Sequence, residues 1–190
     1  MKKYQKTELF SIPNLLTCCR LLMIPIYTVL YLRAEQPRDY LAAALVLALS
    51  CLTDMADGWI ARRFSMITDL GKILDPIADK ATQATLLLCL ALRYPVLWLL
   101  VGLFVLKEGF QLTAGLLTLR TGRMLSGALF AGKLSTTCLF TTLTILVLLP
   151  QIPYGWVLAF TALDAAALLG AFIAYGLAYR RKQADQFQTV

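Results

Sequence analysis

The stretch DMADGWIARRFSMITDLGKILDPIAD, residues 54–79, decides how this chain is interpreted, because it places acidic residues within and between strongly apolar segments. Residues three and four positions apart share one face of a helix. Before the connection, one helix face would carry two acids and two small residues: Asp54, Asp57, Gly58 and Ala61. After it, a second face would carry Gly71, Asp75, Asp79 and Thr82. The stretch therefore predicts two helices with acidic faces.

Apolar residues dominate the chain on both sides of this stretch. Of the 190 residues, 59% are apolar and 15% are charged, and the mean hydropathy is +0.70. A helix needs about 20 apolar residues to cross the hydrocarbon layer of a membrane. Six runs approach this length: residues 12–33, 40–62, 73–93, 95–119, 125–149 and 153–178. We therefore expect an all-α integral membrane protein with six transmembrane helices.

Basic residues are distributed unevenly among the connections, and this asymmetry predicts the orientation of the chain. The termini and the second and fourth connections hold most of them: Lys2, Lys3, Lys6, Arg62, Arg63, Lys72, Arg120, Arg123, Arg180, Arg181 and Lys182. The other connections hold only Arg33, Arg38 and Arg93. Both termini are expected in the cytoplasm. This topology accounts for the net charge of +7 without a nucleic-acid partner.

The chain divides into three expected parts. Residues 1–11 are predicted to form a short amphipathic helix on the cytoplasmic membrane surface, with a frayed basic tail as the alternative. Residues 12–179 are predicted to form one six-helix membrane domain, and residues 180–190 a cytoplasmic tail. The first apolar run is expected to remain as a span, because Arg20 interrupts it and no cleavage site follows.

The four acids are expected to meet at the cytoplasmic ends of the second and third spans. Clustered anions at the edge of hydrocarbon repel one another unless cations neutralise them. The chain has no histidine, and its five cysteines show no metal-ligand spacing. Oxygen ligands alone favour a hard ion such as Mg²⁺, Mn²⁺ or Ca²⁺, and four carboxylates suffice for two ions. The metal ligands are predicted to be Asp54, Asp57, Asp75 and Asp79.

The remaining positions suggest a phosphate-bearing substrate. Gly58, Ala61 and Gly71 leave space on the acidic faces for a large group such as a nucleotide. Arg62 supplies a cation for phosphate or for a neighbouring carboxylate. A two-metal site of this kind suits displacement at phosphorus.

Together these residues form the pattern D-x2-D-G-x2-A-R-x8-G-x3-D-x3-D. It resembles the signature of the CDP-alcohol phosphotransferase family of membrane enzymes. The segment Ile12–Arg20, IPNLLTCCR, is similar to the opening of bacterial phosphatidylglycerophosphate synthases and of related cardiolipin synthases. Weaker similarities at Lys107-Glu108 and Gly132-Lys133 extend the resemblance over most of the chain.

The resemblance implies a role for each matching position. Asp54, Asp57 and Asp75 would bind the metal ions, Mg²⁺ or Mn²⁺, and the CDP pyrophosphate. Asp79 would deprotonate the acceptor hydroxyl and would also contact a metal ion. The residues implied to border the cytidine or to lie near the nucleotide are Gly58, Ala61, Gly71 and Arg62. The resemblance further implies a homodimer in a bacterial plasma membrane, with CMP as the leaving group of CDP-diacylglycerol.

The acceptor is less narrowly defined. Glycerol 3-phosphate would need a cationic pocket, for which Lys133, Arg120 and Arg123 are the candidates, although positive-inside topology also explains such residues. Lys107 and Glu108 are expected to pair elsewhere, because successive residues do not share a helix face. Phosphatidylglycerol and inositol phosphate remain alternative acceptors. A divalent-cation transporter is a remote alternative from another class.

Overall fold

The computed structural model describes residues 11–64, 68, 70–121 and 128–187. Every regular element within these ranges is helical: α2 (Ile12–Arg33), α3 (Tyr40–Arg63), α4 (Gly71–Arg93), the short 3-10 helix η1 (Pro95–Leu97), α5 (Trp98–Thr121), α6 (Ala128–Leu148) and α7 (Tyr154–Phe187). The all-α class is therefore confirmed for the described residues. Apart from Ser11, the predicted amphipathic helix over residues 1–11 lies outside them, and so does Arg123.

The helices follow the predicted apolar runs. The second run, predicted over 40–62, corresponds to the helix Tyr40–Arg63. The third run, predicted over 73–93, corresponds to the helix Gly71–Arg93. The largest difference is in α7, which continues past the predicted end at residue 178 to Phe187. Hydropathy marks where a helix can leave the hydrocarbon, whereas backbone hydrogen bonding continues into the polar residues beyond it.

Five helices are long and apolar enough to cross a membrane: α2, α3, α5 with η1, α6 and α7. Helix α4 does not meet this standard, and its first half carries Lys72, Asp75, Asp79 and Lys80. Large apolar side chains are exposed, among them Leu45 at 70% and Phe130 at 75%. Apolar side chains directed outward are typical of a lipid-facing surface, since lipid solvates them as well as a protein core does. The protein is an integral membrane protein.

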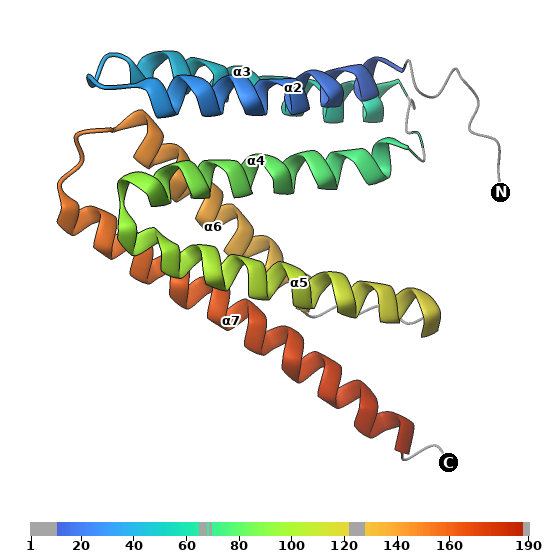
Figure 1. The fold of residues 1–190 in the computed structure, drawn as a ribbon. Coiled ribbons are helices and arrows are strands. Elements are labelled where there is room, and N and C mark those ends of the chain that lie inside the picture. Colours follow the sequence, from blue (N-terminus) through green and yellow to red (C-terminus); the bar gives the residue numbers. More distant parts are fainter. Residues whose placement is uncertain (1–10, 65–67, 69, 122–127, 188–190) are drawn as a thin grey trace. The chain divides into compact units, whose positions relative to one another are not determined.

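The chain forms two compact units, residues 1–89 with 147–151 and residues 90–146 with 152–190. In the first unit, α2 and α3 pack side by side and run in opposite directions (Figure 1). Their connection is closed by Asp39, whose carboxylate accepts hydrogen bonds from the backbone N–H groups of Gln36 at 2.8 Å and Glu35 at 3.2 Å. These bonds lower the pKa of the Asp39 carboxyl. The antiparallel packing brings the last turns of α3 beside the first turns of α2.

In the second unit, α5 and α7 pack along each other (Figure 1). The rings of Phe110 and Phe172 meet edge to face with their centroids 5.3 Å apart. The side chain of Tyr175 on α7 reaches Gly132 on α6, where an added Cβ would overlap the Tyr175 hydroxyl. Glycine at this point therefore leaves the space that the Tyr175 side chain occupies.

A buried ion pair also lies in the second unit. The ammonium of Lys107 donates to Glu108 Oε1 at 2.7 Å and to Thr136 Oγ1 on α6 at 2.9 Å, and the Lys107 side chain is 2% exposed. The expectation that Lys107 and Glu108 pair elsewhere was wrong in this respect. The long, flexible lysine side chain bends toward its neighbour, because an ammonium buried in a membrane protein needs a counter-charge.

Candidate active site

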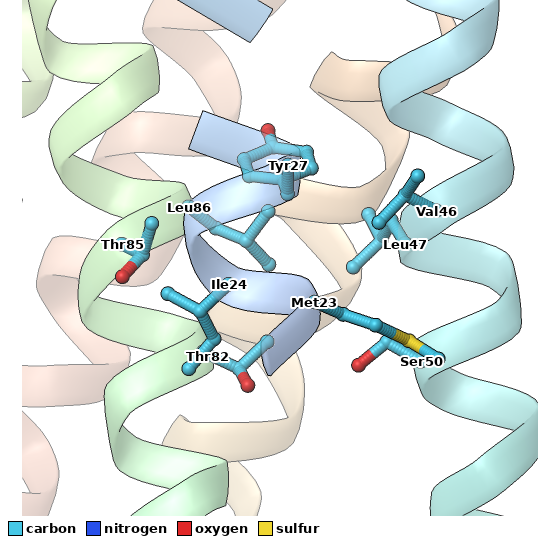
Figure 2. A pocket seen from close by; sticks show the side chains of 9 residues that line it. All are labelled: Met23, Ile24, Tyr27, Val46, Leu47, Ser50, Thr82, Thr85 and Leu86. Carbon is cyan, nitrogen blue, oxygen red and sulfur yellow. The ribbon is translucent and has the colours of Figure 1, made fainter. Parts of the chain in front are cut away.

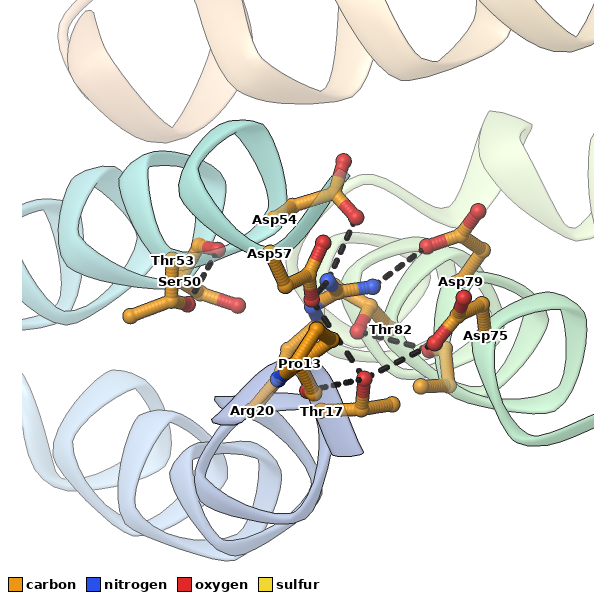
Figure 3. Close-up of polar contacts among 11 residues, drawn as sticks. Pro13, Thr17, Arg20, Ser50, Thr53, Asp54, Asp57, Asp75, Asp79 and Thr82 are labelled. Atoms are coloured by element: carbon orange, nitrogen blue, oxygen red, sulfur yellow. Dashed lines mark hydrogen bonds and ion pairs between the residues drawn. The ribbon is translucent and has the colours of Figure 1, made fainter. Parts of the chain in front are cut away.

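The guanidinium of Arg20, on α2, joins the two acidic faces in the first unit (Figure 3). Its Nη2 lies 2.5 Å from Asp54 Oδ1 and 2.6 Å from Asp57 Oδ2, both on α3. Its Nη1 lies 2.7 Å from Asp79 Oδ1 on α4. Arginine suits this position because its planar fork presents several donors in fixed directions. One side chain thus links α2, α3 and α4.

Thr17, one turn before Arg20, contacts the fourth acid. Its hydroxyl lies 2.8 Å from Asp75 Oδ1, 3.3 Å from Asp57 Oδ2 and 3.1 Å from the carbonyl oxygen of Pro13. A hydroxyl has a single proton to donate, so the shortest contact, to Asp75, is its strongest. Each of the four predicted acids is therefore contacted by α2.

The four carboxylates differ in exposure. The side chain of Asp57 is 6% exposed, whereas those of Asp54 and Asp79 are 50% and 51% exposed. Asp57 thus lies at the base of the cluster, between α2 and α3. Asp54 and Asp79 lie at its accessible side.

Gly71 is the first residue of α4 and lies close to a side chain of α2. An added Cβ would lie 2.8 Å from Asn14 Oδ1 and 3.0 Å from Thr68 Oγ1. The Thr68 hydroxyl donates to Asn14 Oδ1 at 3.1 Å and accepts the Gly71 backbone N–H at 2.9 Å. The small size of Gly71 is therefore used by neighbouring protein atoms, and its predicted role beside a cytidine stays a prediction.

The other predicted site residues that the structure describes lie on three different helices, α3, α5 and α6. Gly58 and Ala61 are partly exposed on α3, near the acids in sequence. Arg62 and Arg120 belong to α3 and α5, but their side chains lie outside the described part. Lys133 is exposed on α6, in the second unit. The acceptor-binding roles of Lys133, Arg120 and Arg123 remain predictions.

The donor atoms of the cluster are carboxylate oxygens, the type of ligand that a hard divalent cation prefers. Four carboxylates face one guanidinium, and even with Lys80 nearby the cluster keeps an excess of negative charge. The contacts from Arg20 and Thr17 engage one oxygen of each carboxylate. As they stand, no three Asp, Glu or Cys side chains in the described residues are close enough together to hold a metal ion. The acids are connected through Arg20 and Thr17 instead.

A small apolar hollow adjoins the acidic cluster along the same three helices, α2, α3 and α4 (Figure 2). Ser50 lies one turn before Asp54 on α3, and Thr82 lies one turn after Asp79 on α4. The remaining lining residues are Met23, Ile24, Tyr27, Val46, Leu47, Thr85 and Leu86. The first unit thus presents a polar site and, one turn further along its helices, an apolar one.

Sequence reasoning missed several polar residues. Asn14 and Thr17 were part of a recognisable segment, but their contacts with Thr68 and Asp75 depend on how distant helices pack. Asp164, in the middle of α7, is 0% exposed. Cys138 and Thr142 lie beside it, although among the described residues none completes a hydrogen bond to its carboxyl oxygens. A lone acid in the last apolar run was the available signal.

Several known proteins are similar to this chain in sequence. A "CDP-diacylglycerol--glycerol-3-phosphate 3-phosphatidyltransferase" of Pseudomonas fluorescens is 42% identical over 89 residues, which is 47% of this chain but only 45% of that protein. A "Cardiolipin synthase (CMP-forming)" of Streptomyces coelicolor is 33% identical over 88% of this chain and 78% of its own length. A protein of Bacillus subtilis with the same name as the Pseudomonas relative is 28% identical over 95% of this chain and 99% of its own length.

The model of one protein family, CDP-alcohol phosphatidyltransferase, matches residues 10–173. This range includes α2, α3 and α4 with all four acids of the site. The family predicted from the sequence pattern is confirmed. The chain belongs to the CDP-alcohol phosphatidyltransferase family.

Proposed function

We propose that the protein transfers the phosphatidyl group of CDP-diacylglycerol to glycerol 3-phosphate, giving phosphatidylglycerophosphate and CMP. The observation that carries the proposal is the gathering of Asp54, Asp57, Asp75 and Asp79 around Arg20 and Thr17. Two of the relatives described above are named for this transfer, and the Bacillus subtilis protein matches along almost its whole length.

The proposed reaction is a displacement at phosphorus. The acceptor hydroxyl attacks the phosphorus that bears the diacylglycerol, and the bond from that phosphorus to the oxygen bridging to CMP breaks. The hydroxyl proton passes to the Asp79 carboxylate. The 51% exposure of the Asp79 side chain supports this role, because a general base must come within hydrogen-bond distance of the hydroxyl.

Divalent metal is part of the proposal. Asp54, Asp57, Asp75 and Asp79 would hold Mg²⁺ or Mn²⁺, as two ions, which when bound neutralise the pyrophosphate and the charge that develops on CMP. Gly58, Ala61, Gly71 and Arg62 would border the nucleotide.

The proposed arrangement in the membrane is six spans with both termini and the site in the cytoplasm. It requires that α4 crosses with the five more apolar helices. A bacterial plasma membrane and a homodimer complete the proposal, with an amphipathic segment at the N-terminus on the membrane surface. The basic residues of the termini and even-numbered connections support the orientation.

A second acceptor deserves a direct test because the Streptomyces coelicolor relative, matched over 88% of this chain, is named a cardiolipin synthase. Purified protein would be given CDP-diacylglycerol and Mg²⁺ or Mn²⁺, with glycerol 3-phosphate, phosphatidylglycerol or inositol phosphate in parallel. We expect CMP release only with glycerol 3-phosphate, and none after EDTA. Release only with phosphatidylglycerol would assign the cardiolipin reaction. Release that survives EDTA would contradict the metal site.

A further inference from the structure

Two residues of helix α2 contact one oxygen of each carboxylate in the acidic cluster. The contacts from Arg20 go to Oδ1 of Asp54, Oδ2 of Asp57 and Oδ1 of Asp79. The strongest contact of Thr17 goes to Oδ1 of Asp75. All four carboxylates are therefore oriented by two residues one turn apart, and each keeps a second oxygen that these bonds do not use.

Burial makes these two positions rigid. Arg20 is 2% exposed and Thr17 is 0% exposed, so both side chains are fixed by the surrounding helices. Asp54 and Asp79 are half exposed, and without Arg20 each would be free to turn toward the solvent. Four like charges on two helices would also separate, because like charges repel strongly where water is scarce.

We propose that Thr17 and Arg20 are positioning residues for the metal site, and that their hydrogen bonds orient the four carboxylates for divalent cations. This inference rests on the proposed function, which assigns those carboxylates to metal. Partners that hydrogen-bond a metal ligand fix its orientation, and their loss typically weakens metal affinity by about 10- to 100-fold. The segment Ile12–Arg20 thereby acquires a role that its resemblance to relatives did not specify.

The test compares Thr17→Val with a matched control on the same helix, Thr28→Val. The Thr28 hydroxyl donates to the carbonyl oxygen of Ile24 at 2.9 Å and neighbours Cys89 rather than the acids. Binding of Mn²⁺ to each purified protein would be measured by electron paramagnetic resonance without any substrate. We expect the Mn²⁺ dissociation constant to rise about tenfold for Thr17→Val and to stay unchanged for Thr28→Val.

Arg20→Lys provides the second arm. A lysine keeps the charge, but its single ammonium does not reproduce the fork that reaches three carboxylates. We expect Mn²⁺ affinity to fall about 10- to 100-fold, with Arg33→Lys at the far end of α2 as control. Thermal unfolding in EDTA, followed by tryptophan fluorescence, checks that each variant is folded.

A kinetic measurement separates positioning from general damage. Saturating Mn²⁺ should restore most of the kcat of Thr17→Val, because its carboxylates and base are intact. Unchanged Mn²⁺ affinity in Thr17→Val and Arg20→Lys would overturn the inference, and tighter binding would also overturn it by showing that Arg20 competes with the metal. If the wild-type protein itself binds no Mn²⁺, the metal site of the proposed function fails instead.

Discussion

The carboxylates of Asp57 and Asp79 have different surroundings, and this difference predicts different defects. Asp79 is half exposed and is proposed to accept the hydroxyl proton, whereas Asp57 is buried against Arg20 and Thr17. Asp79→Asn should lower kcat by about 10²- to 10⁴-fold, the usual contribution of a general base, with little change in the affinity for CDP-diacylglycerol. Asp57→Asn should weaken both turnover and binding.

Measurement of CMP release together with equilibrium binding of the CDP-lipid checks this division of roles. Loss of nucleotide binding to the same extent in both variants would contradict it. Glu35→Gln, at an exposed position in the connection between α2 and α3, serves as a control for removing a carboxylate.

Gly71 offers a second prediction for a single residue. A methyl group there would press on Asn14 Oδ1 and on Thr68 Oγ1, which together position the start of α4. Gly71→Ala should destabilise the protein by about 1–3 kcal/mol, as overpacking generally does, and should reduce CMP release. Gly102→Ala is the matched control, since nothing lies within 4 Å of its added Cβ. Equal thermal stability of Gly71→Ala and Gly102→Ala would contradict this prediction, because it would show that Asn14 and Thr68 can make room for the added methyl group.

At the scale of the helices, α6 and α7 of the second unit meet where the Tyr175 side chain reaches Gly132. An added Cβ at Gly132 would overlap the Tyr175 hydroxyl and would lie 3.1 Å from two of its ring atoms. Gly132→Ala should therefore cost about 1–3 kcal/mol of stability. Adding Tyr175→Phe should recover part of this loss, because it removes the nearest atom and leaves the ring.

A double-mutant cycle measured by thermal unfolding in detergent detects this coupling. Gly170→Ala on α7 is the control, because no atom lies within 4 Å of its added Cβ. Additive effects of Gly132→Ala and Tyr175→Phe would mean that the two helices separate rather than clash.

For the whole molecule, α4 decides the topology. Five helices are apolar enough to cross a membrane, and α4 is the sixth long helix in the described residues. If all six cross, both termini lie on one side. Reporter fusions at each end should therefore both report the cytoplasm. Termini on opposite sides would show that α4 does not cross, and would exclude the six-span proposal.

The sequence predicted much of this architecture because two signals in it are local. Apolar length located α2 and α3 to within a residue, and spacing three and four apart placed Asp54 with Asp57 on one face. The contacts of Arg20 were not predictable in the same way. They depend on which helix packs beside which, and no local pattern in residues 12–33 specifies a partner on α4.

The polar first half of α4 has a consequence for how the protein is made. Charged residues oppose the insertion of an isolated spanning helix, and the first half of α4 carries two Asp and two Lys residues. Arg20 and Thr17 on α2 supply partners for Asp79 and Asp75. In the six-span arrangement, α4 therefore depends on helices synthesised before it for stable integration. Insertion of α4 into the membrane and assembly of the acidic cluster would then occur in the same step. A nascent chain with a defective α2 would fail at this step and would be degraded by quality-control proteases before it could bind substrate.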